Sequence, residues 1–261
     1  MNVDTDVRPD TGWRRRILSL MGPVLVALLL AAALLLLYRS LRNYHYHDLV
    51  NRVRSYSTLS IVIAFCLTAL NYFVLTFYDV LALRYVGVRL SYRRTAFASF
   101  MSYVFSYNVG LSLFGSSALR YRFFSSWGID GATIAKIVAF CVSTFWVGLA
   151  VMGGASLLAG IPAVAGIAGF HFGFRLLGAM LLLAVIAYLV ACATRVPGIR
   201  LKSFTLGFPS PRIASLQVLV AAFDWVLAGL VLYSLLPSGR PAFLPFLAIF
   251  AIAQLAGATS H

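Results

Sequence analysis

Long apolar runs recur along the chain and constrain its fold more than any other feature. Each run has about 20 residues, enough to cross the hydrocarbon core of a bilayer as a helix. Hydrophobic residues make up 61% of the 261 residues, and charged residues only 11%. We therefore predict an all-α, polytopic helical membrane protein with about six or seven spans. The expected spans are 17–38, 57–83, 132–158, 173–193, 213–236 and 242–258.

The stretch 95–119 breaks this pattern, because small and polar residues interrupt its apolar run. Irregular backbone at membrane depth is tolerated only where it is buried in protein or lines a polar cavity. The stretch then runs directly into Arg120 and Arg122, and we expect the functional site beside it. The interrupting residues are Ser102, Ser106, Asn108, Gly110, Ser112, Gly115, Ser116 and Ser117.

Basic loops indicate how this stretch meets the membrane, since Lys and Arg accumulate on the cytoplasmic side. If 95–119 crossed once, the basic loop 195–212 would face outward. If it enters and leaves on the same side, the loops 84–94, 120–122 and 195–212 all become cytoplasmic. Two full crossings need about 40 residues, more than the stretch provides. We therefore predict a re-entrant helical hairpin near 95–119 that turns at Asn108–Gly110.

The N-terminus is expected in the cytoplasm. Residues 1–16 form a polar tail, and Arg14, Arg15 and Arg16 precede the first apolar run. The remaining 17–261 form the transmembrane domain. This predicts a multi-pass membrane protein with a cytoplasmic N-terminus.

The net charge of +14 favours anionic phospholipid headgroups as partners, because the basic residues lie in short loops between spans. Nucleic-acid binding is not expected, since no soluble domain is present to carry it. No cofactor or metal is predicted either. The three cysteines fall inside spans without metal-like spacing, and His45 and His47 lack a third nearby ligand.

Two acids, Asp79 and Asp224, fall inside predicted spans. An intramembrane acid faces the protein interior or a water-filled cavity, because exposure to lipid costs several kcal/mol. The functional interpretation is a polar cavity that contacts a cationic headgroup. The alternative is a structural pair, such as Asp79 with Arg84 near the interface.

Arg120 and Arg122 are candidates for holding a lipid phosphate, because a guanidinium offers forked donors to phosphate oxygens. The alternative is that both are cytoplasmic anchors of the positive-inside kind. Asn108, at the expected turn, completes the candidate headgroup-binding set. No catalytic constellation accompanies it: Walker, dinucleotide and nucleophile-elbow motifs are missing, and the chain contains no Glu.

The run from Ser102 to Ile129 resembles the membrane domain of bacterial phosphatidylglycerol lysyltransferases, the multiple peptide resistance factor family. The similarity lies in Asn108-Val109-Gly110, Gly115-Ser116-Ser117, Arg120-Tyr121-Arg122 and Trp127-Gly128. The segment from Tyr78 to Gly87 is similar to the family as well. The closing Ser260-His261 resembles the start of a further family motif, so the domain is expected to be incomplete at its C-terminal end.

This resemblance implies a multi-pass protein of the bacterial inner (plasma) membrane. It implies translocation of aminoacylated phosphatidylglycerol to the outer leaflet, with lysyl-phosphatidylglycerol as the expected lipid and resistance to cationic antimicrobial peptides as the outcome. It implies a homodimer as a possible assembly. The family's aminoacyltransferase domain, which uses charged tRNA, has no counterpart in the 261 residues, so enzymatic activity stays open. The alternative is a stand-alone membrane protein of the same superfamily that moves another lipid or acts as a scaffold.

Overall fold

The computed structural model describes residues 56–109, 112–159, 171–194, 199–201, 204–237 and 239–259. The chain divides into two compact units, 1–57 and 58–261, and all the elements below belong to the second. The expected span 17–38 and the polar tail 1–16 lie outside the described residues. So do the side chains of residues 107–109 and 112–115.

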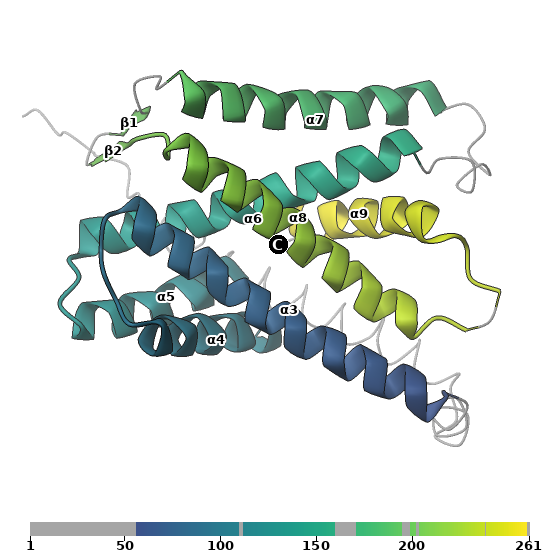
Figure 1. Ribbon diagram of the computed structural model, residues 1–261, viewed down its shortest axis with the longest axis horizontal. Coiled ribbons are helices and arrows are strands. Elements are labelled where there is room, and N and C mark those ends of the chain that lie inside the picture. Colours follow the sequence, from purple (N-terminus) through teal and green to yellow (C-terminus); the bar gives the residue numbers. More distant parts are fainter. Residues whose placement is uncertain are drawn as a thin grey trace, which may run out of the picture. The chain divides into compact units, whose positions relative to one another are not determined.

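The described part is helical except for one short ribbon (Figure 1). Four helices are long and apolar enough to cross a membrane: α3 (Thr58–Tyr85), α6 (Gly131–Ala159), α7 (His171–Ala193, apolar from Phe172) and α8 (Pro211–Ser234). A fifth, α9 (Phe243–Thr259), is apolar but shorter. These helices confirm the helical membrane fold, while the total number of spans stays a prediction.

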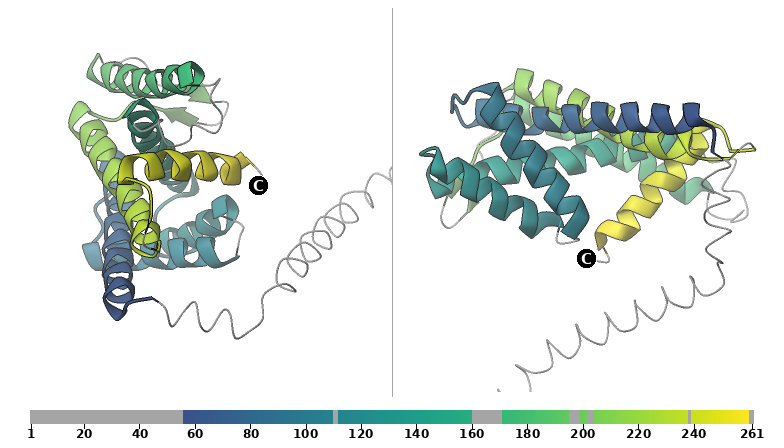
Figure 2. Two further views of the ribbon diagram at one scale, coloured as in Figure 1. Left: turned by 90° about the vertical axis from the view of Figure 1, so that its right-hand side faces the viewer. Right: turned by 90° about the horizontal axis from the view of Figure 1, so that it is seen from below.

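The predicted helical hairpin is present, with longer arms than the sequence suggested. Helix α4 (Tyr92–Val109) and helix α5 (Ser112–Ser126) pack side by side (Figures 1 and 2). Residues 110–111 between them lie outside the described residues. Arg120 and Arg122 therefore lie within the second arm rather than after the hairpin. Helix continues to Ser126 and stops before Gly128, whose φ of +83° allows the Ile129 amide to bond back to the Phe124 carbonyl.

The strands were not expected from the sequence. In the basic loop before α8, β1 (Ile199–Leu201) pairs antiparallel with β2 (Phe204–Leu206), with Arg200 opposite Thr205. Helix α8 then begins at an N-cap, Ser210, followed by Pro211 in the first turn. The ribbon is a local feature of the loop and leaves the helical fold class unchanged.

Helix α8 packs against both α3 and α6, and α6 also contacts α7 and α9 (Figure 1). The close approach of α6 and α8 depends on Gly148, where a Cβ atom would lie 2.7 Å from the Ala221 carbonyl oxygen. Gly154 plays the same role against α7, where a Cβ atom would come within 3.0 Å of the Gly178 carbonyl oxygen. Small residues at these crossings let membrane helices pack at short distance.

Apolar side chains are exposed along one side of α7 and on the first half of α3. On α7 they are Leu176, Met180, Leu183, Ile186 and Val190, and on α3 they include Leu59, Val62 and Phe65. Exposed apolar rows of this kind are expected where helices contact lipid rather than water. The buried polar groups instead gather between helices.

Candidate functional site

Asp79 and Arg120 form a buried ion pair that joins helix α3 to the second arm of the hairpin. Arg120 donates from Nε to Asp79 Oδ1 over 2.7 Å and from Nη2 to Oδ2 over 3.0 Å. The Asp79 side chain is 0% exposed and the Arg120 side chain 3%. This forked geometry uses both carboxylate oxygens and is the strongest arrangement open to the two groups.

Two further helices close around the pair. The Arg120 guanidinium carbon lies 4.7 Å from the centre of the Tyr103 ring on α4, a cation–π contact. Cys141 on α6 places its sulfur 3.8 Å from Asp79 Oδ1. Side chains from α3, α4, α5 and α6 thus meet at one point, and the charges there are fully enclosed by protein.

The sequence analysis gave Asp79 and Arg120 as separate candidate residues, and in the structure they form one ion pair. The alternative partner considered for Asp79, Arg84, is wrong: Asp79 is buried with Arg120, whereas Arg84 is exposed in the last turn of α3. A neighbour five residues along a helix points to a different side of it, so it cannot follow the carboxylate inward.

Asp224 lies in a second buried cluster, between α8 and α3. Its Oδ1 accepts a hydrogen bond from the Asn71 amide at 2.7 Å, and its Oδ2 accepts one from the Tyr78 hydroxyl at 2.8 Å. The residue is 7% exposed. Neither partner carries a charge, which distinguishes this carboxyl group from that of Asp79.

The two clusters share a boundary. Tyr78 bonds to Asp224 and directly precedes Asp79, and its ring packs edge-on against the Tyr103 ring with centres 6.2 Å apart. Tyr103 in turn faces the Arg120 guanidinium. The buried polar groups therefore form a continuous series from α8 to the hairpin.

A third cluster surrounds Gln217, which shares a helix face with Asp224. The Gln217 amide donates to the hydroxyl oxygens of Thr144 at 2.8 Å and Ser143 at 3.2 Å, and its carbonyl accepts from Tyr188. These bonds tie α6, α7 and α8 together. Since every polar atom of the Gln217 side chain is used, the cluster is a structural one.

Helix α4 turns a face of small hydroxyl residues into the protein. Its buried members are Thr95, Ser99, Ser102 and Ser106. Ser99 donates to the Leu75 carbonyl at 3.3 Å, but the Ser102 hydroxyl has no hydrogen-bond partner among the described residues. A buried hydroxyl without a partner is uncommon and keeps its hydrogen-bonding capacity for a ligand or water.

The other two candidate residues do not join these clusters. Arg122 is exposed on α5, and no described residue forms an ion pair with it. Asn108 falls near the end of α4, but its side chain is outside the described residues. Their proposed contacts with a headgroup stay predictions.

Several residues of the site carry no strong signal in the sequence. Tyr78, Tyr103 and Cys141 have the residue types expected in ordinary membrane helices, and nothing in the sequence singles them out. Asn71 gives the clearest signal that was passed over, because an amide in the middle of a 28-residue apolar helix needs a polar partner inside the protein. No group of three metal-binding side chains occurs in the described part of the chain.

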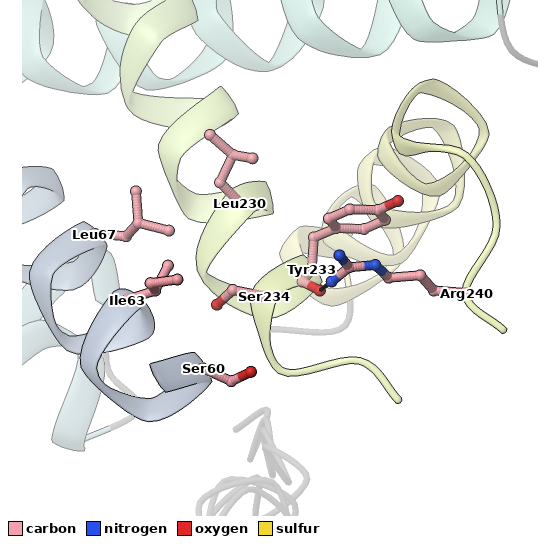
Figure 3. A pocket seen from close by; sticks show the side chains of 7 residues that line it. All are labelled: Ser60, Ile63, Leu67, Leu230, Tyr233, Ser234 and Arg240. Atoms are coloured by element: carbon pink, nitrogen blue, oxygen red, sulfur yellow. Dashed lines mark hydrogen bonds between the residues drawn. The ribbon is translucent and has the colours of Figure 1, made fainter. Parts of the chain in front are cut away.

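A pocket of about 220 Å³ lies apart from these clusters, between the start of α3 and the end of α8 (Figure 3). Ile63, Leu67 and Leu230 form its apolar wall. Arg240 lies at one edge, 4.3 Å from the centre of the Tyr233 ring, and donates to the Tyr233 carbonyl at 2.9 Å. None of the site residues predicted from the sequence lines this pocket.

Long apolar helices with a charged pair enclosed between them define a multi-pass helical membrane protein. Two curated proteins are similar to the chain. An uncharacterized protein of Synechocystis, slr0712, is 36% identical over 210 residues, which are 76% of this chain and 62% of that protein. The inner membrane protein YbhN of Escherichia coli is 29% identical over 247 residues, or 91% of this chain and 75% of that protein.

The chain thus spans less than two thirds of the Synechocystis relative and three quarters of YbhN. No family model matches it. The relationship to YbhN and the four apolar helices identify a multi-pass inner membrane protein. The resemblance to the lysyltransferase membrane domain is not confirmed by these similarities.

Proposed function

We propose that the protein moves a phospholipid with a zwitterionic or cationic headgroup between the leaflets of the inner membrane, aminoacylated phosphatidylglycerol being the expected substrate. The observation that carries this proposal is the enclosed Asp79–Arg120 pair at the base of the hairpin. Removing two charges from water costs several kcal/mol each, so a buried ion pair that only holds helices together adds little to the net free energy of folding. A functional role explains why charges are kept there.

The chemistry of the pair matches that of the lipid. An aminoacylated phosphatidylglycerol carries a phosphate anion and at least one ammonium group. Arg120 can exchange the Asp79 carboxylate for the phosphate, and Asp79 or Asp224 can then accept the ammonium, so each charge keeps an opposite partner throughout. Such an exchange avoids leaving an uncompensated charge in the membrane.

Other features support the same assignment. The Ser102 hydroxyl, next to Tyr103 in sequence, has unused hydrogen-bonding capacity for a headgroup. The exposed Arg122, two residues after Arg120, is available to a phosphate at the membrane surface. We propose further that the hairpin is re-entrant, with Asn108 at its turn, and that the N-terminus is cytoplasmic.

The second candidate is a stand-alone membrane protein that moves another lipid or acts as a scaffold. The similarity to YbhN favours it, because that protein's name describes an inner membrane protein and no transferase. A homodimer, synthesis of the lipid and peptide resistance are proposals attached to the first candidate alone.

A leaflet-exposure assay tests the proposal. The full chain is reconstituted into liposomes containing fluorescent aminoacylated phosphatidylglycerol, and the fraction accessible to an external quencher is followed over time. Arg120→Ala combined with Arg122→Ala should abolish the acceleration seen with the wild-type protein. If the double variant exchanges lipid at the wild-type rate at equal protein content, the assignment is wrong.

A charge swap separates transport from mere assembly. Asp79→Arg together with Arg120→Asp can restore an ion pair but reverses its direction relative to the headgroup. We expect this variant to recover more monodisperse protein than either single change and to remain inactive in exchange. If the swapped variant exchanged lipid at the wild-type rate, the pair would serve only to hold the helices together.

A further inference from the structure

The carboxyl group of Asp224 lies near the centre of the membrane-spanning part. Asp224 is close to the midpoint of α8, Pro211–Ser234, and its partner Asn71 is close to the midpoint of α3, Thr58–Tyr85. A charge at this depth has the highest cost, because water is farthest away on both sides. An ionised Asp224 therefore needs strong compensation from its neighbours.

Its neighbours do not supply an opposite charge. Its two hydrogen-bond partners, Asn71 and Tyr78, are both neutral, and no Lys or Arg pairs with Asp224 within the part of the chain that the structure describes. The Asp79 carboxylate, by contrast, has both oxygens on the Arg120 guanidinium. The two intramembrane acids thus occupy opposite kinds of environment.

The other ionisable groups on the helices packed around α8 do not change this difference between the surroundings of Asp79 and Asp224. On α3, Tyr78 faces Asp224, whereas Asp79 faces Arg120. The other ionisable groups of α3 have different surroundings: Cys66 and Arg84 are exposed, Tyr72 packs against Phe100, and Tyr85 donates to the Gly207 carbonyl. Helix α9 has no ionisable residue in its sequence. The remaining groups on described neighbours have other surroundings: Cys141 contacts Asp79, Tyr188 bonds to Gln217, Lys136 lies in the first turns of α6, and Arg175 and Cys192 lie near the two ends of α7.

The partners can serve Asp224 in either protonation state. A tyrosine hydroxyl is both donor and acceptor, so Tyr78 can donate to the carboxylate or accept from the protonated acid by rotating its O–H bond. The Asn71 amide donates to Oδ1 in both states. A guanidinium such as that of Arg120 has donors only and cannot adapt in this way.

We propose that Asp224 is a proton-binding site at the centre of the bilayer. A proton from water binds Asp224 Oδ2 and cancels its charge, while the Tyr78 hydroxyl changes from donor to acceptor. The proton leaves when a cationic group replaces it at the carboxylate. The carboxylate charge is therefore neutralised in either case, by the proton or by the cationic group, and no other bond is made or broken.

This inference goes beyond the proposed lipid transport and does not depend on the identity of the lipid. It is tested by infrared difference spectroscopy on the purified full chain in lipid nanodiscs, between about pH 5 and about pH 9. A protonated buried carboxyl group has a carbonyl stretch that an ionised one lacks. Labelling aspartate with carbon-13 identifies the band, and the chain has no Glu whose side-chain band could overlap with it.

The wild-type protein should show a carboxylic-acid band that appears as the pH falls. Asp224→Asn should lose this band completely, while the matched variant Asp130→Asn, which changes an exposed carboxylate, should keep it. A band that persists at full size in Asp224→Asn, or a wild-type spectrum without any such band, overturns the proposal.

A second variant covers the case in which Asp224→Asn does not fold. Tyr78→Phe removes the hydroxyl partner but keeps the ring, so the frequency of the band and the pH at which it appears should both change. An unaltered band in Tyr78→Phe refutes the assignment to Asp224. Failure of the lipid-exchange assay has no effect on these spectra, so the two proposals fail independently.

Discussion

Removal of the Arg120 side chain provides the most direct test of how the hairpin is held. In Arg120→Met the Asp79 carboxylate would stay buried without its cation, and both side chains are enclosed enough that solvent screening is negligible. Breaking a buried pair on one side costs about 3–5 kcal/mol. That corresponds to a decrease of roughly 100-fold to 5,000-fold in the ratio of folded to unfolded protein.

The double variant Asp79→Leu with Arg120→Met should behave differently. It removes both charges, fills similar volume and leaves no unpaired group, so its free energy of unfolding should lie within about 2 kcal/mol of wild type. The matched control is Arg122→Met, whose exposed side chain predicts a change of at most about 0.5 kcal/mol.

The assay is equilibrium unfolding by denaturing detergent in mixed micelles, followed by circular dichroism. It is applied to the wild-type protein, to the single variants Asp79→Leu and Arg120→Met, and to the double variant. The difference between the summed single changes and the double change is the coupling energy of the pair. If Arg120→Met costs no more than Arg122→Met, the ion pair contributes nothing to the fold and the reasoning is refuted.

Three further predictions concern helix packing, the cation–π contact and the cap before α6. Gly148→Ala should destabilise the protein by about 1–3 kcal/mol in the same unfolding assay, because its Cβ atom meets the Ala221 carbonyl, whereas Gly207→Ala, which has open space, should not. Tyr103→Leu should weaken the hairpin by up to about 2 kcal/mol through loss of the cation–π contact, and an unchanged unfolding midpoint would exclude that contact. Hydrogen bonds from Thr133 hold the pKa of Asp130 below its usual value, so the stability that this cap contributes is present at neutral pH and is lost as pH falls through the lowered pKa. Asp130→Asn should flatten the acid end of the curve of stability against pH, and a curve identical to wild type would contradict this.

Local features of the molecule were open to prediction. The helices α3, α6, α7 and α8 begin and end within two residues of the expected spans, because runs of apolar residues need no distant partner to indicate a membrane helix. Of the expected turn near Asn108–Gly110, Asn108 and Val109 belong to α4, and Gly110 lies outside the described residues. The β1–β2 ribbon was missed, since its strands are only three residues long.

Side-chain contacts between different helices could not be predicted from such local patterns. The sequence by itself determined that Asp79, Arg120 and Asp224 are buried or near the membrane, because their cost in lipid is a property of each residue. Which residue compensates them was decided by the tertiary structure: Arg120, 41 positions away, reaches Asp79, while Asp224 receives Asn71 and Tyr78. Those choices depend on how each helix is rotated about its axis and how closely small residues let it approach, and neither quantity is contained in a local pattern.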